Sequence, residues 1–226
     1  RYSSPIQIGP NKYWKKVISR EYHTLAISED GTLWAWGKNG SGQLGDGTND
    51  HRYLPTLISS SADWSSIGCG ITHSIALKTD GTLWAWGSNG YGQLGDGTNT
   101  SSNSPIQIGT STEWNSISNG AYHSIAKKND GTIWAWGWNS SGQLGDGTDE
   151  NKSTPLQIAS TIACKSISGG NNYTVSIKTD GSIWAWGSCK FCQIGYKFWP
   201  TQLYSNTDWE TIVCSGSHKL ALKSDG

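Results

Sequence analysis

The string Trp-Ala-Trp-Gly occurs four times in the 226-residue chain, always at an interval of 50 residues. The copies begin at Trp34, Trp84, Trp134 and Trp184. An Asp-Gly pair precedes each copy, at Asp30, Asp80, Asp130 and Asp180, and a fifth pair is Asp225-Gly226. Gly-Gln-Leu-Gly-Asp-Gly-Thr follows the first three copies, from Gly42, Gly92 and Gly142. Because independent markers share one period, the fold must be built from near-identical units.

Further markers divide the chain into units. A proline recurs at Pro5, Pro55, Pro105, Pro155 and Pro200. Nine residues after each proline stands Trp14, Trp64, Trp114, Cys164 or Trp209. Eighteen residues after it stands His23, His73, His123, Tyr173 or His218. We expect one domain, residues 1–226, with units at about 5–54, 55–104, 105–154 and 155–199 and an incomplete unit at 200–226.

Each unit has the pattern of four short strands. In the third unit we expect strands at 105–108, 114–119, 123–128 and 132–136. Asp130-Gly131 joins the last two strands and predicts a type I′ hairpin turn, which requires positive φ at both central residues. Gly and Asn clusters separate the other strands, and no stretch shows the periodicity of an amphipathic helix.

The alternation of side chains along these strands predicts how the units pack. Trp134 and Trp136 point to one face of the sheet and Ala135 points to the other. A four-stranded sheet cannot bury both faces alone, but copies stacked around an axis can, with a bulky face against a small one. We therefore predict an all-β fold, a β-propeller of four-stranded antiparallel blades.

The combined motif of the third unit identifies a family. Trp114-x-x-Ile117-x-x-Gly120-x-x-His123, Asp130-Gly-Thr-Ile-Trp-Ala-Trp-Gly137 and Gly142-Gln-Leu-Gly145 together resemble the regulator of chromosome condensation repeat. The resemblance extends over essentially the whole chain. A WD-type repeat would end in Trp-Asp instead of Trp-Gly, and a kelch repeat would carry a double Gly in each unit. The resemblance implies a propeller, usually of seven blades, and roles that range from guanine-nucleotide exchange on a small GTPase to inhibitor and scaffold.

The number of expected strands is smaller than seven blades require. One leading strand, four full units and two trailing strands make about four and a half blades. We expect a partial propeller, part of a seven-bladed one. The alternative is a five-bladed ring in which the last blade lacks its Trp-Ala-Trp strand. An open arc would expose apolar faces and strand edges on its end blades.

Two recurring motifs are candidates for metal binding. The histidines suggest a ring of ligands, but ligands must converge on one ion, and we expect each ring nitrogen to bond to local backbone instead. The Asp-Gly-Thr loops at 46–50, 96–99 and 146–150 superficially resemble calcium loops, but Gly and Thr occupy positions 2 and 3, and turn chemistry explains them. We expect no metal.

The cysteines and serines give no catalytic pattern. Among five cysteines, Cys189-x-x-Cys192 lies in a turn, and it fits a local disulfide or two free thiols better than a zinc or redox site. No Gly-x-Ser-x-Gly elbow or phosphate-binding loop is present. We expect no enzyme and no cofactor.

Charge and composition restrict the partners. Lys+Arg and Asp+Glu both number 17, so the neutral chain favours neither nucleic acid nor an anionic membrane as a partner. The apolar runs are short, and we expect no membrane insertion. The low charge and abundant Gly, Ser and Asn resemble bacterial secreted or cell-surface copies of this repeat, although the compartment stays open. A chain that begins at Arg1 carries no information about a signal peptide, and the oligomeric state is also open.

Positions that differ between units are the candidates for function, because the common blade does not require them. The variable segments are 38–41, 88–91, 138–141 and 188–191, together with 49–54, 99–104 and 149–154. Their aromatic residues and one arginine are our candidate partner-binding residues: Tyr53, Tyr91, Trp138, Phe191 and Arg52. We expect a non-catalytic scaffold that binds a protein partner through these loops. The alternatives are nucleotide exchange on a small GTPase, glycan binding through the loop aromatics, and scattered surface aromatics without a partner.

Overall fold

The computed structural model describes residues 7–9, 13–158, 164–189, 194–216 and 218–225. Regular structure in these residues consists of eighteen β-strands, which form four four-stranded antiparallel sheets and one two-stranded sheet. None of the described residues forms a helix long and apolar enough to cross a membrane. The predicted all-β fold of four-stranded blades is confirmed.

The strands follow one another in chain order within each sheet. Blade 1 contains β1 (Trp14–Arg20), β2 (His23–Ser28), β3 (Leu33–Gly37) and β4 (Arg52–Ser59). Blade 2 contains β5 (Trp64–Cys69), β6 (His73–Lys78), β7 (Leu83–Gly87) and β8 (Ser102–Gln107). Blade 3 contains β9 (Trp114–Asn119), β10 (His123–Lys128), β11 (Ile133–Gly137) and β12 (Lys152–Ile158). Blade 4 contains β13 (Cys164–Gly169), β14 (Tyr173–Lys178), β15 (Ile183–Cys189) and β16 (Ile194–Gln202), and the two-stranded sheet contains β17 (Trp209–Ser215) and β18 (His218–Lys223).

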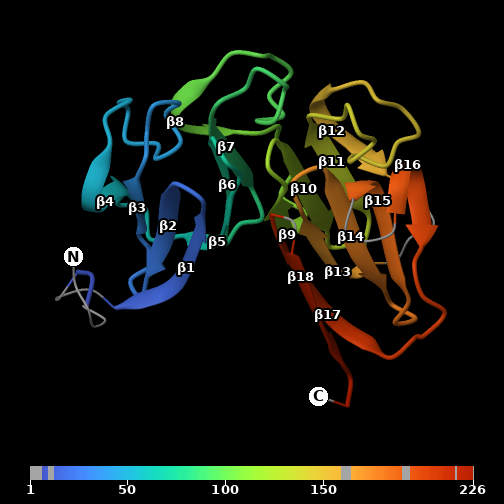
Figure 1. Ribbon diagram of the computed structural model, residues 1–226. Helices are drawn as coiled ribbons and strands as arrows, with labels where there is room; N and C mark the ends of the chain where they lie inside the picture. Colours follow the sequence, from blue (N-terminus) through green and yellow to red (C-terminus); the bar gives the residue numbers. More distant parts are fainter. Residues whose placement is uncertain (1–6, 10–12, 159–163, 190–193, 217, 226) are drawn as a thin grey trace.

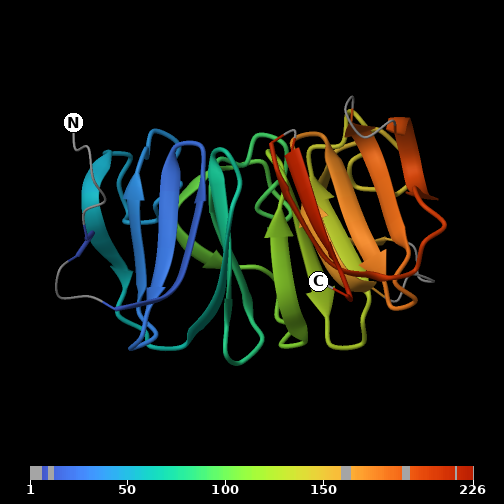
Figure 2. The same ribbon diagram turned by 60° about the horizontal axis from the view of Figure 1, so that its bottom comes forward.

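The blades follow one another around an arc (Figure 1), with the first strand of each blade on the inside and the fourth on the outside. Figure 2 shows the same blades standing next to one another. The proline strand is the outer strand of the preceding blade: Gln107 on β8 pairs with Trp84 on β7. Each blade therefore starts at a Trp or Cys strand and ends at the next proline strand. The expected leading strand near Pro5 falls largely outside the described residues, and residues 7–9 form no strand.

The strands predicted at 105–108, 114–119, 123–128 and 132–136 lie close to β8, β9, β10 and β11, but the predicted turn is wrong. Equivalent hairpins share one geometry: Gly31 N donates to Ser28 O at 2.9 Å, and Ser28 N donates to Thr32 O at 3.1 Å. Gly31 has a positive φ of 82°, whereas Glu29 and Asp30 do not. This is a three-residue loop, a type I turn followed by a glycine bulge, and not a type I′ turn. The Asp30 carboxylate favours it because it accepts a hydrogen bond from Thr32 N at 3.0 Å.

The bulky and small faces of the blades pack as predicted. The rings of Trp134 and Trp136 both contact Trp114 of their own blade, with centroid distances of 5.8 and 6.4 Å, so they share one face. The opposite face carries the buried Ala135. Where blades 1 and 2 meet, Leu33 and Ala35 pack in one cluster with Trp86 of the next blade. Each blade thus places its small face against the tryptophan face of the following blade.

Apolar side chains are exposed on the first and last sheets. Val17 on β1 and Val213, Leu220 and Leu222 on the two-stranded sheet are at least half exposed. The equivalent side chains of the inner blades are covered by neighbouring sheets, as Ile67 and Ile75 are. Burial in this architecture therefore depends on contact with a neighbouring blade.

Candidate functional site

A buried layer of polar contacts joins each blade to the next. The Gly42–Gly45 segment of blade 1 crosses onto blade 2, where the Gln43 carbonyl accepts hydrogen bonds from Trp86 Nε1 at 2.9 Å and Ser74 Oγ at 2.8 Å. Gly45 is required because a Cβ there would lie 2.8 Å from Trp86 Nε1. Gln93 accepts the same two bonds from Trp136 and Ser124 of blade 3. The segment Gly-Gln-Leu-Gly, which is identical in the first three units of the chain, thus connects one blade to the next.

Three of the recurring histidines, His23, His73 and His123, belong to this layer, whereas His218 is exposed. His23 Nε2 lies 3.0 Å from Ser74 Oγ, and His123 Nε2 lies 3.0 Å from Thr174 Oγ1, each on the following blade. Each hydroxyl donates its proton to a glutamine carbonyl, so the ring Nε2–H is the donor to the hydroxyl. The expectation that these rings bond to local backbone is wrong, because their partners lie in the next blade. Burial lowers the pKa of His23 to about 4 and that of His123 to about 3, so both rings are neutral.

The Asp-Gly-Thr loops are held by their own hydrogen bonds. Buried Asn39 donates through Nδ2 to Asp46 Oδ1 at 3.1 Å and to the Thr48 carbonyl at 3.0 Å. Arg52 Nε donates to Asp46 Oδ2 at 2.6 Å. Although burial acts in the opposite direction, bonds from Thr48 and Arg52 lower the pKa of Asp46. The turn explanation holds for these loops, and Arg52 is a partner within its own loop as well as a candidate contact.

No group of three His, Cys, Asp or Glu side chains in the described part of the chain is arranged to hold a metal ion. The described cysteines Cys69, Cys164 and Cys214 are free and buried. Burial raises the pKa of Cys69 to about 12 and that of Cys164 to about 11, so neither is a reactive thiolate at neutral pH. Cys192 lies outside the described residues, so the structure does not describe the Cys189–Cys192 pair.

The variable segments of the first three blades gather at one end of the blades, which we call the loop face. It contains the turns between the first and second strands of each blade and the loops between the third and fourth strands. Backbone bonds connect the turns of neighbouring blades near the inside of the arc, from Ile71 N to Ala121 O at 2.9 Å and from Ala121 N to Gly170 O at 3.1 Å. The loop face is therefore a continuous surface.

Two of the candidate residues meet on this face. Tyr91 of blade 2 packs against Tyr122 and Trp138 of blade 3, with ring centroids 5.8 Å apart in both pairs. Tyr122 and Trp138 are 5.7 Å apart with their planes at 81°. Tyr91 is 42% exposed, and the other two rings are partly exposed. We call these three residues the aromatic cluster; sequence reasoning missed Tyr122, which differs from its counterpart Thr72 in blade 2.

The other candidates lie elsewhere. Tyr53 is 90% exposed and belongs to β4, the strand at the outer edge of blade 1 in Figure 1, whereas the aromatic cluster joins blades 2 and 3. Arg52 precedes it and bonds to Asp46. Phe191 lies outside the described residues. The structure therefore brings together Tyr91 and Trp138 but not the remaining candidates.

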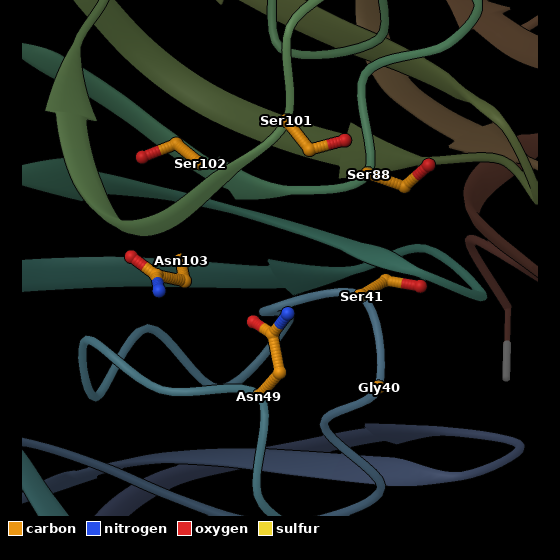
Figure 3. Close-up of a pocket in the computed structure, with 7 residues that line it drawn as sticks. All are labelled: Gly40, Ser41, Asn49, Ser88, Ser101, Ser102 and Asn103. Carbon is orange, nitrogen blue, oxygen red and sulfur yellow. The ribbon is translucent and has the colours of Figure 1, made fainter.

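A cavity of about 510 Å³ opens on the loop face between blades 1 and 2. It is lined by Ser41 and Asn49 of blade 1 and by Ser88, Ser101, Ser102 and Asn103 of blade 2 (Figure 3). We call it the serine cavity. Its residues belong to four of the variable segments, 38–41, 49–54, 88–91 and 99–104, but none of them was a candidate because none is aromatic.

Arg20 is a second residue that sequence reasoning missed. Its guanidinium reaches across the inside of the arc and donates to the Asn119 carbonyl and to Asn171 Oδ1, both at 3.0 Å. It connects blade 1 to blades 3 and 4, although blade 2 lies between them in the chain. Burial lowers its pKa. The sequence does distinguish Arg20, because the equivalent residues of the next three units are Gly70, Gly120 and Gly170.

Comparison with known families agrees with this architecture. A family model described as "Regulator of chromosome condensation (RCC1) repeat" matches residues 30–77, 80–126 and 130–177, more than half of the chain. A second model with the same description matches residues 64–93 and 114–143. The chain belongs to the RCC1 repeat family, as its motifs predicted.

Solved structures share the fold over nearly the whole chain, whereas sequence similarity to a curated relative extends over a short segment. The chain is 43% identical to the mitochondrial RCC1 domain-containing protein RUG3 of Arabidopsis thaliana over 42 residues, which are 19% of this chain and 9% of that protein. The structure of human WBSCR16 matches 94% of this chain and 58% of that one, at 19% identity and a TM-score of 0.84. Prp20p of Saccharomyces cerevisiae matches 98% of this chain and 60% of its own, at 20% identity and a TM-score of 0.81. The chain thus spans less than two thirds of the length of each.

Proposed function

We propose that this protein is a non-catalytic scaffold that binds a protein partner through its loop face, with the aromatic cluster at the centre of the contact. The observation that carries the proposal is the exposed packing of Tyr91 on Tyr122 and Trp138. The blade fold does not require these rings, because the equivalent positions at the junction of blades 1 and 2 are Ser41, Thr72 and Ser88. In this proposal residues 1–226 act as one propeller domain.

The arrangement of the aromatic cluster is suited to binding. Tyr and Trp are enriched among the residues that dominate interface energies, and they lose little conformational entropy on contact. The three rings already hold one another in place, so a partner would meet a preorganised surface. Tyr53, at 90% exposure, and Arg52 would extend the contact toward blade 1.

Structural relatives support a protein as the partner. The structure of Prp20p is described together with its binding properties to Gsp1p and histones, and another structure contains Kap60 bound to yeast RCC1. The neutral charge of this chain also fits a partner that is not held by strong electrostatic attraction. No contact among the described residues specifically favours nucleotide exchange, and we do not propose it.

A quantitative pull-down tests the proposal. The wild-type protein, the double variant Tyr91→Ala/Trp138→Ala and the control Asn115→Ala are immobilised and incubated with an extract of the source cells and of their medium. Asn115 is an exposed side chain at the end of blade 3 opposite the loop face. We expect at least one protein that the wild type and the control retain and the double variant loses by roughly tenfold or more. Identical sets of proteins on all three, with unchanged folding, would contradict the proposal.

A further inference from the structure

The serine cavity lies at the position that the aromatic cluster occupies one junction later. Ser41 is equivalent to Tyr91, Thr72 to Tyr122 and Ser88 to Trp138, because each pair is separated by the 50-residue repeat. The buried layer beneath the two junctions is the same, with Trp86 bonded to Gln43 in one and Trp136 to Gln93 in the other. Small hydroxyl residues thus stand where the next junction has three aromatic rings, and two of them, Ser41 and Ser88, line the space of about 510 Å³.

The wall of this cavity is polar and uncharged. Ser101 Oγ accepts a hydrogen bond from Asn89 N at 3.1 Å, and Ser102 Oγ donates to the Ser104 carbonyl at 2.7 Å. Asn103 Nδ2 donates to the Gly47 carbonyl at 2.9 Å, across the junction. These bonds fix three of the lining residues to the backbone and hold the wall in a defined shape.

Other lining groups are free to bind. Within the described residues, the hydroxyls of Ser41 and Ser88 and the amide of Asn49 make no hydrogen bond to the protein. Figure 3 shows the Asn49 side chain extending from its loop into the space between the blades. Hydroxyl and amide groups both donate and accept hydrogen bonds, so they match a ligand whose groups do the same.

We propose that the serine cavity binds a pyranose unit of a neutral glycan. Its volume lies within the range of small-molecule sites, and its free hydroxyls and amide match the paired hydroxyls of a sugar ring. A tyrosine side chain from a partner would fit less well, because its apolar faces would cover Ser41, Ser88 and Asn49 without satisfying them. An anionic ligand has no cation in the wall, and Arg52 nearby in sequence is paired with Asp46.

This site shares the loop face with the proposed protein contact, but it lies at the neighbouring junction and its lining contains none of the three residues of the aromatic cluster. It also differs from the glycan-binding alternative based on loop aromatics, because the lining contains no aromatic residue. The two functions use different junctions and are tested by different variants.

The test is an NMR titration of the whole ¹⁵N-labelled protein with maltose, cellobiose, lactose and N,N′-diacetylchitobiose. We expect at least one of these sugars to cause saturable shifts of the Gly40, Ser41 and Ser88 amides, with one site and millimolar affinity. Ser88→Trp, which introduces the residue of the next junction, weakens this binding tenfold or more. Asn49→Ala weakens it several-fold, and the matched control Asn99→Ala, the equivalent position of blade 2 outside the cavity, leaves it unchanged.

Several outcomes would overturn the inference. They are the absence of saturable shifts with all four sugars, equal binding by Asn49→Ala and Asn99→Ala, and binding of N-acetyltyrosinamide at these amides in preference to the sugars. The double variant Tyr91→Ala/Trp138→Ala should keep its sugar binding while it loses the protein partner. Either proposal can therefore fail without the other.

Discussion

Two junctions, one between blades 1 and 2 and one between blades 2 and 3, have similar interiors but differ on the loop face. In both interiors a tryptophan Nε1 donates to a glutamine carbonyl, from Trp86 to Gln43 at 2.9 Å and from Trp136 to Gln93 at 3.0 Å. On the loop face, serines and asparagines line a cavity at the first junction, whereas at the second junction Tyr91 and Trp138, which replace Ser41 and Ser88, pack against each other. The interior therefore carries the stability of the fold, and the loop face is free to carry binding.

Acid is expected to have the largest effect, because it acts on the interior of three junctions at once. Burial lowers the pKa of His23 to about 4 and of His73 and His123 to about 3, below the value of about 6.5 in the unfolded chain. The unfolded state therefore binds more protons below pH 6.5, and the stability that is fully present above that pH is lost as pH falls toward 4. Three histidines at about 1.4 kcal/mol per pH unit each give a loss of about 4 kcal/mol per unit near pH 5.

Urea unfolding at a series of pH values measures this slope. His123→Gln should remove about one third of it, since one of the three titrating groups is gone. A free energy of unfolding that is constant between pH 7 and pH 5 would mean that the histidine layer is not buried as described.

Two tryptophans that are only two residues apart allow the interior and the loop face to be compared. Trp136 is fully buried, and Trp136→Ala should lower the free energy of unfolding by about 3–5 kcal/mol. Trp138 is partly exposed in the aromatic cluster, and Trp138→Ala should cost about 1 kcal/mol, the value of aromatic contacts alone. Chemical denaturation of both variants checks the difference; equal losses would show that the loop face is also structural.

Two glycines, one in the interior and one on the loop face, should show a smaller difference in stability when each is replaced by alanine. A Cβ on Gly120 would lie 1.9 Å from His123 Cε1, so Gly120→Ala should destabilise the protein by about 1–3 kcal/mol. Gly90 on the loop face has open space around its missing side chain, and Gly90→Ala should change stability by less than about 0.5 kcal/mol. The thermal midpoints of the two variants provide the measurement, and a larger shift for Gly90→Ala would be inconsistent with the division into interior and loop face.

The sequence predicted the features that depend on local pattern. The opposite placement of Trp136 and Ala135 follows from strand alternation, which neighbouring residues determine. The type I′ prediction for Asp130-Gly131 is wrong because the same dipeptide occurs in two hairpin geometries, and only the backbone bonds of Lys128 to Gly131 and Thr132 distinguish them.

The sequence did not predict the polar contacts between blades. The hydroxyl partner of His23 lies on a strand 51 residues away, and the Arg20 contact to Asn171 spans 151 residues. The serine cavity also escaped prediction, since it arises where bulky side chains are missing. Comparing the units position by position would have indicated it, because Ser88 stands where the next unit has Trp138.

The central claim is that Trp86, Trp136 and Trp186, which repeat at one position, are sealed between blades while the loop face above them is accessible. Hydrogen exchange of the indole N–H groups, followed by NMR, tests it most directly. The N–H groups of Trp86 and Trp136, bonded to Gln43 and Gln93, should exchange only when the protein unfolds, roughly a thousandfold or more slowly than that of Trp138. Rates for Trp86 and Trp136 as fast as that of Trp138 would contradict the account.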